Sequence, residues 1–214
     1  HSHQFIISSS IVGSGMDLIK SGIGEVRFSG SAANTYSGTT YVNHGHLVLN
    51  KTSGVSIPGD LVVEAGGSVN LGAFAGQIPS TSTLTIKEDG LFTTSASLTH
   101  GSGVTIHGGI YMIVNCGPSV AVGGEGLAFN GGRIQYASTT PNSFGLQTDV
   151  GYASSSTRQA LWYNFSSGDF GINLNGGNRT FNIPISAQLS AATTEMVVSV
   201  PIKGSAAGSR LTKT

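Results

Sequence analysis

The sequence predicts an all-β fold, a parallel β-helix (β-solenoid) of about nine or ten coils that forms one segment over residues 1–214. Composition and an internal repeat carry this prediction. Only 9% of the residues are charged, 38% are hydrophobic, and glycine occurs 32 times in 214 residues. Such a composition excludes a disordered chain, because disorder requires few apolar residues and many charges.

The repeat is a short strand of alternating apolar residues, a glycine-centred turn and a second short strand. Alternation with a period of two predicts strands with one buried face, and glycine or asparagine supplies the backbone conformations of tight corners. Turn glycines at 45, 67, 90, 109 and 132 are separated by 22, 23, 19 and 23 residues, which predicts one coil per interval. The pattern occupies residues 41–48, 61–71, 84–92, 104–111, 127–134 and 172–181.

Three segments interrupt the repeat, at residues 73–82, 138–143 and 152–158. Insertions in a solenoid become loops on one side, and that side is often the recognising one. With adjacent strands about 4.8 Å apart, the coils predict a rod about 45 Å long that carries these loops as contact sites.

The two ends of the chain resemble each other. Residues 5–21 resemble residues 196–214, which indicates a superrepeat of about 193 residues. The chain is then either one unit of a longer polypeptide or a unit that stacks head to tail with copies of itself. Chance similarity is the third explanation, since the matching residue types are common ones.

Residues 22–50 carry a more specific pattern. A Gly-x-Gly strand at 22–24 is followed by a Ser-Gly-Ser-Ala-Ala-Asn-Thr-Tyr turn and then by Gly-Thr-Thr-Tyr-Val-Asn-His-Gly-His-Leu at 38–47. This segment resembles the autotransporter-associated β-strand repeat, also called the passenger-associated transport repeat. It departs from that repeat in having two alanines in place of one and a histidine where a small residue is usual. The resemblance implies a right-handed parallel β-helix that is exported across a bacterial outer membrane and displayed on or released from the cell surface.

Charge, hydropathy and cysteine content exclude several partners. Ten basic and ten acidic residues give a net charge of zero, so we expect no nucleic-acid partner. No apolar run approaches the roughly 18 residues that span a bilayer, so we expect no membrane insertion of this segment. The single cysteine, Cys116, cannot form an internal disulfide, and we expect a buried, inert thiol.

Candidate catalytic and metal-binding groups are poorly developed. Asp60 and Glu64 could share one strand face, but their span of about 13 Å exceeds the separation that a pair of hydrolytic carboxylates uses. His44 and His46 would provide only two metal ligands. We therefore expect no enzyme, no cofactor, and no catalytic, cofactor-binding or metal-binding residues. The alternative is a carbohydrate-active β-helix, a tailspike-like polysaccharide lyase or hydrolase, with carboxylates or an Arg-Asp pair converging in one groove on neighbouring coils.

An aromatic cluster near residue 162 is the candidate interaction patch, composed of Trp162, Tyr163 and Phe165 together with Tyr152 and Arg158. These side chains could form a sugar-stacking platform or a protein interface. The favoured interpretation of the cluster is a set of bulky fillers in a widened core coil.

Together these patterns predict a structural or adhesive extracellular rod, an autotransporter passenger-type repeat protein. Its expected location is extracellular or on a bacterial outer-membrane surface, where it is displayed or secreted as an adhesin or as a subunit of a filament. Expected partners are adjacent repeats of the same chain or head-to-tail copies of itself, and surface glycans or proteins.

Overall fold

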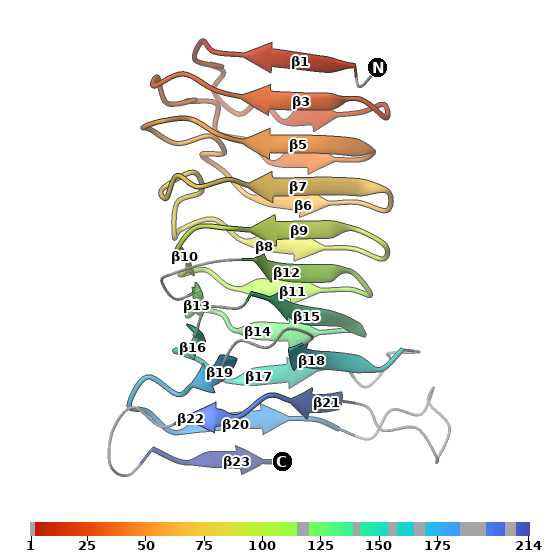
Figure 1. Cartoon of the computed structure of the whole chain (residues 1–214), viewed down its shortest axis with the longest axis vertical. Coiled ribbons are helices and arrows are strands. Elements are labelled where there is room, and N and C mark those ends of the chain that lie inside the picture. The colour runs from red at the N-terminus through yellow and green to blue at the C-terminus, as the bar shows by residue number, and fades with distance from the viewer. Residues whose placement is uncertain are drawn as a thin grey trace.

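The computed structural model describes residues 3–114, 120–138, 142–153, 158–164, 170–184, 196–203 and 209–214. Within these ranges the regular elements are all β-strands, no helix is present, and every strand pairing is parallel. The strands stack along the long axis of the molecule, with the N-terminus at one end and the C-terminus near the other (Figure 1). The predicted all-β parallel β-solenoid is therefore confirmed, while its handedness and its number of coils stay predictions.

The described strands form three parallel sheets, here called A, B and C. Sheet A contains β1 (Gln4–Ile7), β3 (Glu25–Phe28), β5 (Gly45–Leu49), β7 (Gly67–Leu71), β9 (Leu91–Thr94), β12 (Ile110–Val114), β15 (Gly132–Ala137), β18 (Ala160–Asn164) and β21 (Met196–Ser199). Sheet B contains β2 (Leu18–Lys20), β4 (Thr40–Val42), β6 (Leu61–Val63), β8 (Leu84–Ile86), β11 (Val104–Ile106), β14 (Leu127–Phe129), β17 (Val150–Tyr152), β20 (Arg179–Asn182) and β23 (Leu211–Lys213). Sheet C contains β10 (Leu98–His100), β13 (Val120–Val122), β16 (Asn142–Leu146), β19 (Phe170–Asn173) and β22 (Ile202–Lys203).

The core is a set of stacked side-chain columns. In sheet A, Leu47, Val69, Phe92 and Tyr111 are in-register partners on successive strands, and each is fully buried. Alternate residues point inward because successive side chains of a strand lie on opposite faces. No coil buries its apolar face alone, so the stability of each coil depends on its neighbours.

The predicted glycine turns join sheet B to sheet A. At Gly67 a Cβ atom would lie 2.0 Å from the carbonyl oxygen of Val42, so the close approach of the preceding coil excludes a side chain there. Asparagine adopts the left-handed conformation as expected, at Asn175, with φ of 50°. The sixth copy of the pattern, residues 172–181, differs: it joins β19 of sheet C to β20 of sheet B. Its glycines therefore do not continue the series that begins at Gly45.

The third side of the solenoid changes along the rod. Before β10, buried polar side chains hold it together, among them Asn34, Lys51, Ser56 and Gln77. The Lys51 ammonium donates to the backbone oxygens of Ser29 at 3.2 Å and Ser9 at 3.4 Å. From β10 onward sheet C replaces these groups. The predicted contact loop at 73–82 thus contributes buried residues to the wall, Gln77 among them, whereas the interruptions at 138–143 and 152–158 lie partly outside the described residues.

The similar terminal segments occupy the same two sheets at opposite ends of the rod. Residues 5–7 lie in β1 and residues 196–198 in β21, both in sheet A, while β2 and β23 both belong to sheet B. When the in-register partners in sheet A are followed strand by strand from Phe5 in β1, they lead to Trp162 in β18 and then to Val198 in β21. The sequence match instead aligns Phe5 with Met196, so the two segments share a face but differ by two residues in register.

Candidate functional site

A polar groove crosses the turns between sheet B and sheet A in the middle of the rod. Its volume is about 410 Å³. The lining residues come from four successive turns and are Lys87, Glu88, His107, Gly108, Asn130 and Arg158.

The stacking of coils places the groove residues above one another. Lys87 directly follows β8, His107 directly follows β11 and Asn130 directly follows β14, so these three residues occupy the same position of their coils. Glu88 lies one residue further along its turn. Because neighbouring strands are about 4.8 Å apart, polar side chains at this position form a row along the rod. Within the row, the side-chain nitrogen of Asn130 lies 3.3 Å from Nδ1 of His107.

Arg158 lies across this row and pairs with Glu88, which is 70 residues earlier in the chain. A turn glycine, Gly131, makes room for it. A Cβ atom there would be 2.6 Å from Cβ of Arg158, closer than two such atoms can approach. The Tyr152 hydroxyl donates to the Arg158 carbonyl oxygen at 2.8 Å, which anchors the backbone.

The Arg158–Glu88 pair is exposed, with side chains 51% and 56% accessible. Ion pairs in this setting contribute about 0–1 kcal/mol to stability. The pair therefore shapes the groove more than it stabilises the fold. The groove presents a guanidinium, an imidazole and a carboxamide, whose planar groups can bind the hydroxyls of a sugar.

Several acidic residues, Asp60 and Glu64 among them, have structural partners. Asp17, Asp60 and Asp149 each accept the backbone N–H of a threonine on the next coil at 2.8 Å: Thr39, Thr83 and Thr180 respectively. Glu64 pairs with Lys87 at 2.7 Å. Asp60 and Glu64 are thus each held by a different group.

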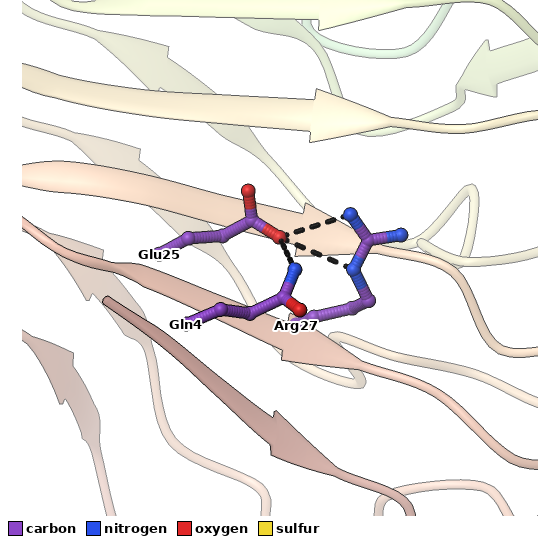
Figure 2. Close-up of polar contacts among 3 residues, drawn as sticks. All are labelled: Gln4, Glu25 and Arg27. Atoms are coloured by element: carbon purple, nitrogen blue, oxygen red, sulfur yellow. Dashed lines mark hydrogen bonds and ion pairs between the residues drawn. The ribbon is translucent and has the colours of Figure 1, made fainter. Parts of the chain in front are cut away.

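A second polar cluster fastens the first strand of sheet A to the next one. Figure 2 shows the Glu25 carboxylate between the side chains of Gln4 and Arg27. One carboxylate oxygen accepts from the Gln4 amide and from Nε and Nη2 of Arg27, the latter two at 3.1 and 2.9 Å. The hydrogen bond from Gln4, followed by the interactions with Arg27, holds the pKa of Glu25 below its usual value.

The structure divides the predicted interaction patch. Trp162 is fully buried and Tyr152 is 5% exposed, so the surface interpretation is wrong for both rings. Trp162 instead packs edge-on against Phe144, with ring centroids 4.9 Å apart, which confirms the core-filler interpretation for this residue. Tyr163 is half-buried and bonds to Gln135 on the neighbouring strand. Arg158 is exposed in the groove, and Phe165 lies outside the described residues, as does Cys116.

The histidines have different environments. His44 and His46 are exposed, whereas His100 is buried beside Tyr111, with 2.9 Å between Nε2 and the hydroxyl oxygen. Burial lowers the pKa of His100 to about 3. Among the described residues, no group of three or more histidine, cysteine, aspartate or glutamate side chains is placed to hold a metal ion.

Sequence reasoning missed the groove although a signal was present. A polar residue follows the sheet B strand in successive repeats, at Lys87, His107 and Asn130. The contribution of Arg158 had no such signal, because its partner is three repeats away.

Comparison with known proteins finds no matching family model, no matching curated protein and no matching solved structure. In the part of the chain that the structure describes, no helix is long and apolar enough to cross a bilayer.

Proposed function

We propose that this chain is a segment of a structural or adhesive rod that a bacterium presents outside the cell, of the autotransporter passenger type. The observation that carries the proposal is the ladder itself. Among the described residues, two sheets run through nine parallel strands each, every strand paired with the next. At about 4.8 Å between strands, such a stack is about 40 Å long, and it is stiff because every coil is bonded to both neighbours.

The segment at 22–50, which suggested the passenger family, contributes to the coil architecture. Asn34 accepts the backbone N–H of Ile11 at 3.0 Å and donates to the carbonyl oxygen of Ser56 at 2.6 Å, so it links three coils. The buried Tyr36 hydroxyl lies 2.6 Å from Oγ1 of Thr40. These contacts give the motif a physical role in building a rod, which supports the family assignment as part of the proposal.

The polar groove is the proposed adhesive surface. It lies mid-rod, and exposed Lys87, His107 and Arg158 offer hydrogen-bond donors toward solvent. Glycans on a neighbouring surface are suited to such a site because their hydroxyls can both donate and accept hydrogen bonds.

One observation favours a second function, the carbohydrate-active β-helix. That hypothesis predicts carboxylates or an Arg-Asp pair converging in one groove on neighbouring coils. Arg158 and Glu88 form a related pair, an arginine with a glutamate, between the turns that follow β17 and β8. A lyase or hydrolase would use the same groove that the adhesin proposal assigns to binding.

Two measurements on the purified chain test the proposal. Small-angle X-ray scattering should give an elongated particle, and a glycan array should show binding that Arg158→Ala weakens and Arg210→Ala leaves unchanged. Arg210 is the matched control because it is exposed and lies on the last coil. Incubation with the bound glycans should release no shortened or unsaturated sugars. Release of such products would favour the enzyme hypothesis over the adhesin hypothesis, and a compact particle would contradict the rod.

A further inference from the structure

The pair Asn130–Gly131 at the polar groove is a dipeptide that can react with itself. When glycine follows asparagine, no side chain hinders attack of the glycine nitrogen on Cγ of the asparagine. The attack expels ammonia and leaves a cyclic imide, which water opens to aspartate or isoaspartate. The chain contains this dipeptide twice, at 130–131 and at 175–176. Their surroundings differ, so their reactivities should differ as well.

The Gly131 nitrogen is the nucleophile, and its N–H takes no part in the hydrogen-bond ladder. On either side of it, the Asn130 N–H donates to the Ile106 carbonyl oxygen at 2.8 Å, and the Arg133 N–H donates to that of Gly109 at 2.9 Å. Gly131 is buried, yet within the described part of the chain its N–H has no acceptor. Buried backbone N–H groups are nearly always paired, so this one is an exception. Ring closure at Gly131 therefore breaks no hydrogen bond of the nucleophile.

His107 is placed to assist the leaving group. Its Nδ1 atom lies 3.3 Å from the side-chain nitrogen of Asn130, the atom that departs as ammonia. Expulsion of this nitrogen requires a proton, which a histidine within hydrogen-bond reach can supply as a general acid. His107 is exposed and Asn130 is half-buried in a groove of about 410 Å³, so water reaches both side chains.

We propose that Asn130 is a site of spontaneous deamidation that His107 assists. First, the Gly131 nitrogen loses its proton to water and bonds to Cγ of Asn130. The bond from Cγ to the side-chain nitrogen breaks, and ammonia leaves with a proton from the imidazolium form of His107. Then a water molecule adds to the imide, and the ring opens to a carboxylate. The net reaction consumes water and releases ammonia, and His107 regains its proton from the solvent.

Deamidation changes what the groove offers to a ligand. The carboxamide of Asn130 donates and accepts hydrogen bonds, whereas a carboxylate only accepts them and carries a negative charge. The product lies beside His107, in the groove that already contains Glu88. This consequence rests on the proposed function, while the modification itself does not: a groove that binds glycans should bind acidic ones more weakly after the change.

Peptide mapping by mass spectrometry tests the proposal. The unchanged chain and His107→Gln are incubated at neutral pH, and conversion of the amides at positions 130 and 175 is followed over time. The unchanged chain should accumulate aspartate and isoaspartate at position 130, and His107→Gln should lose most of this conversion. Asn175 is the internal control, because in the described structure its side chain has no hydrogen-bond partner; it should convert equally in both chains.

An Asn130 that keeps its amide throughout the incubation, or equal conversion at this position in both chains, would overturn the proposal. Circular dichroism checks that His107→Gln keeps its β-structure. Asn130→Asp reproduces the charge of the product and should bind acidic glycans more weakly than the unchanged chain does. Conversion is measured without any glycan, so a chain that binds no glycan can still show the modification. A chain that keeps its amide can likewise still bind glycans, and the two proposals fail separately.

Discussion

The side-chain amide of Gln77 pairs with the backbone of Lys51 as a neighbouring strand would. The Lys51 N–H donates to Oε1 of Gln77 at 3.0 Å, and Nε2 of Gln77 donates to the Lys51 carbonyl oxygen at 2.8 Å. Both residues are fully buried. A side chain thus completes the hydrogen-bond ladder on the third side of the solenoid, before sheet C begins.

Replacement of Gln77 by leucine should destabilise the fold by about 2–4 kcal/mol, because two buried backbone groups of Lys51 lose their partners. Urea unfolding followed by Trp162 fluorescence measures the change. Asn70→Ala is the control, since Asn70 is exposed on β7, and it should stay within about 0.5 kcal/mol of the unchanged protein. Equal stability of the two variants would show that the amide does not complete the ladder.

His100 should make the fold acid-sensitive. Its pKa is about 3 in the folded chain and 6.5 when unfolded, so only the unfolded chain binds the proton between these values. The contribution of His100 to the unfolding free energy is therefore fully present above pH 6.5, and it falls by about 1.4 kcal/mol per pH unit as the pH drops toward 3. His100→Gln keeps a hydrogen-bonding group near Tyr111 but cannot take up the proton. Its unfolding free energy should show a shallower pH dependence over this range, and identical slopes would contradict the assignment.

Gly131→Ala should destabilise the chain more than Gly15→Ala. Both glycines have positive φ, 72° and 67°, and forcing alanine into this conformation costs about 1–2 kcal/mol. At Gly15 nothing lies within 4 Å of the added Cβ, whereas at Gly131 the new atom meets Arg158. The difference in unfolding free energy between the two variants, measured with urea, therefore reports the contact of Arg158 with the turn. Equal unfolding free energies would mean that Arg158 does not contact Gly131.

Glu25→Gln should loosen the first strand without unfolding the rod. The substitution removes the charge that Gln4 and Arg27 bind, so amide hydrogens of Phe5–Ile7 should exchange faster at neutral pH. In the unchanged protein the same loosening should appear on acidification: the pKa of Glu25 is lowered by folding, so its contribution is present above the unfolded pKa and lost as the pH falls through the folded one. Glu64→Gln, whose partner Lys87 lies mid-rod, should leave β1 exchange unchanged.

The limits of sequence reasoning are clearest at Trp162. Leu161, Trp162 and Tyr163 are consecutive apolar residues, so the alternation of inward and outward residues does not say which of them is buried. Register decides it: Trp162 pairs with Ile134 and Val198 in an inward column, which leaves Tyr163 on the outer face. Where apolar and polar residues alternate, as at Leu84, Thr85 and Ile86, the buried positions could be predicted directly.

The sequence by itself determined the strands, the glycine turns between them and the stacking into a solenoid, because period-two alternation and corner conformations are local properties. Tertiary structure alone decided the partners across coils: the ladder between Gln77 and Lys51, the third wall of sheet C, and the reach of Arg158 to Glu88. Those contacts depend on how many residues each loop holds and on which coil lies opposite which. No local pattern contains that information, since the contacting residues are separated by 26 or 70 positions.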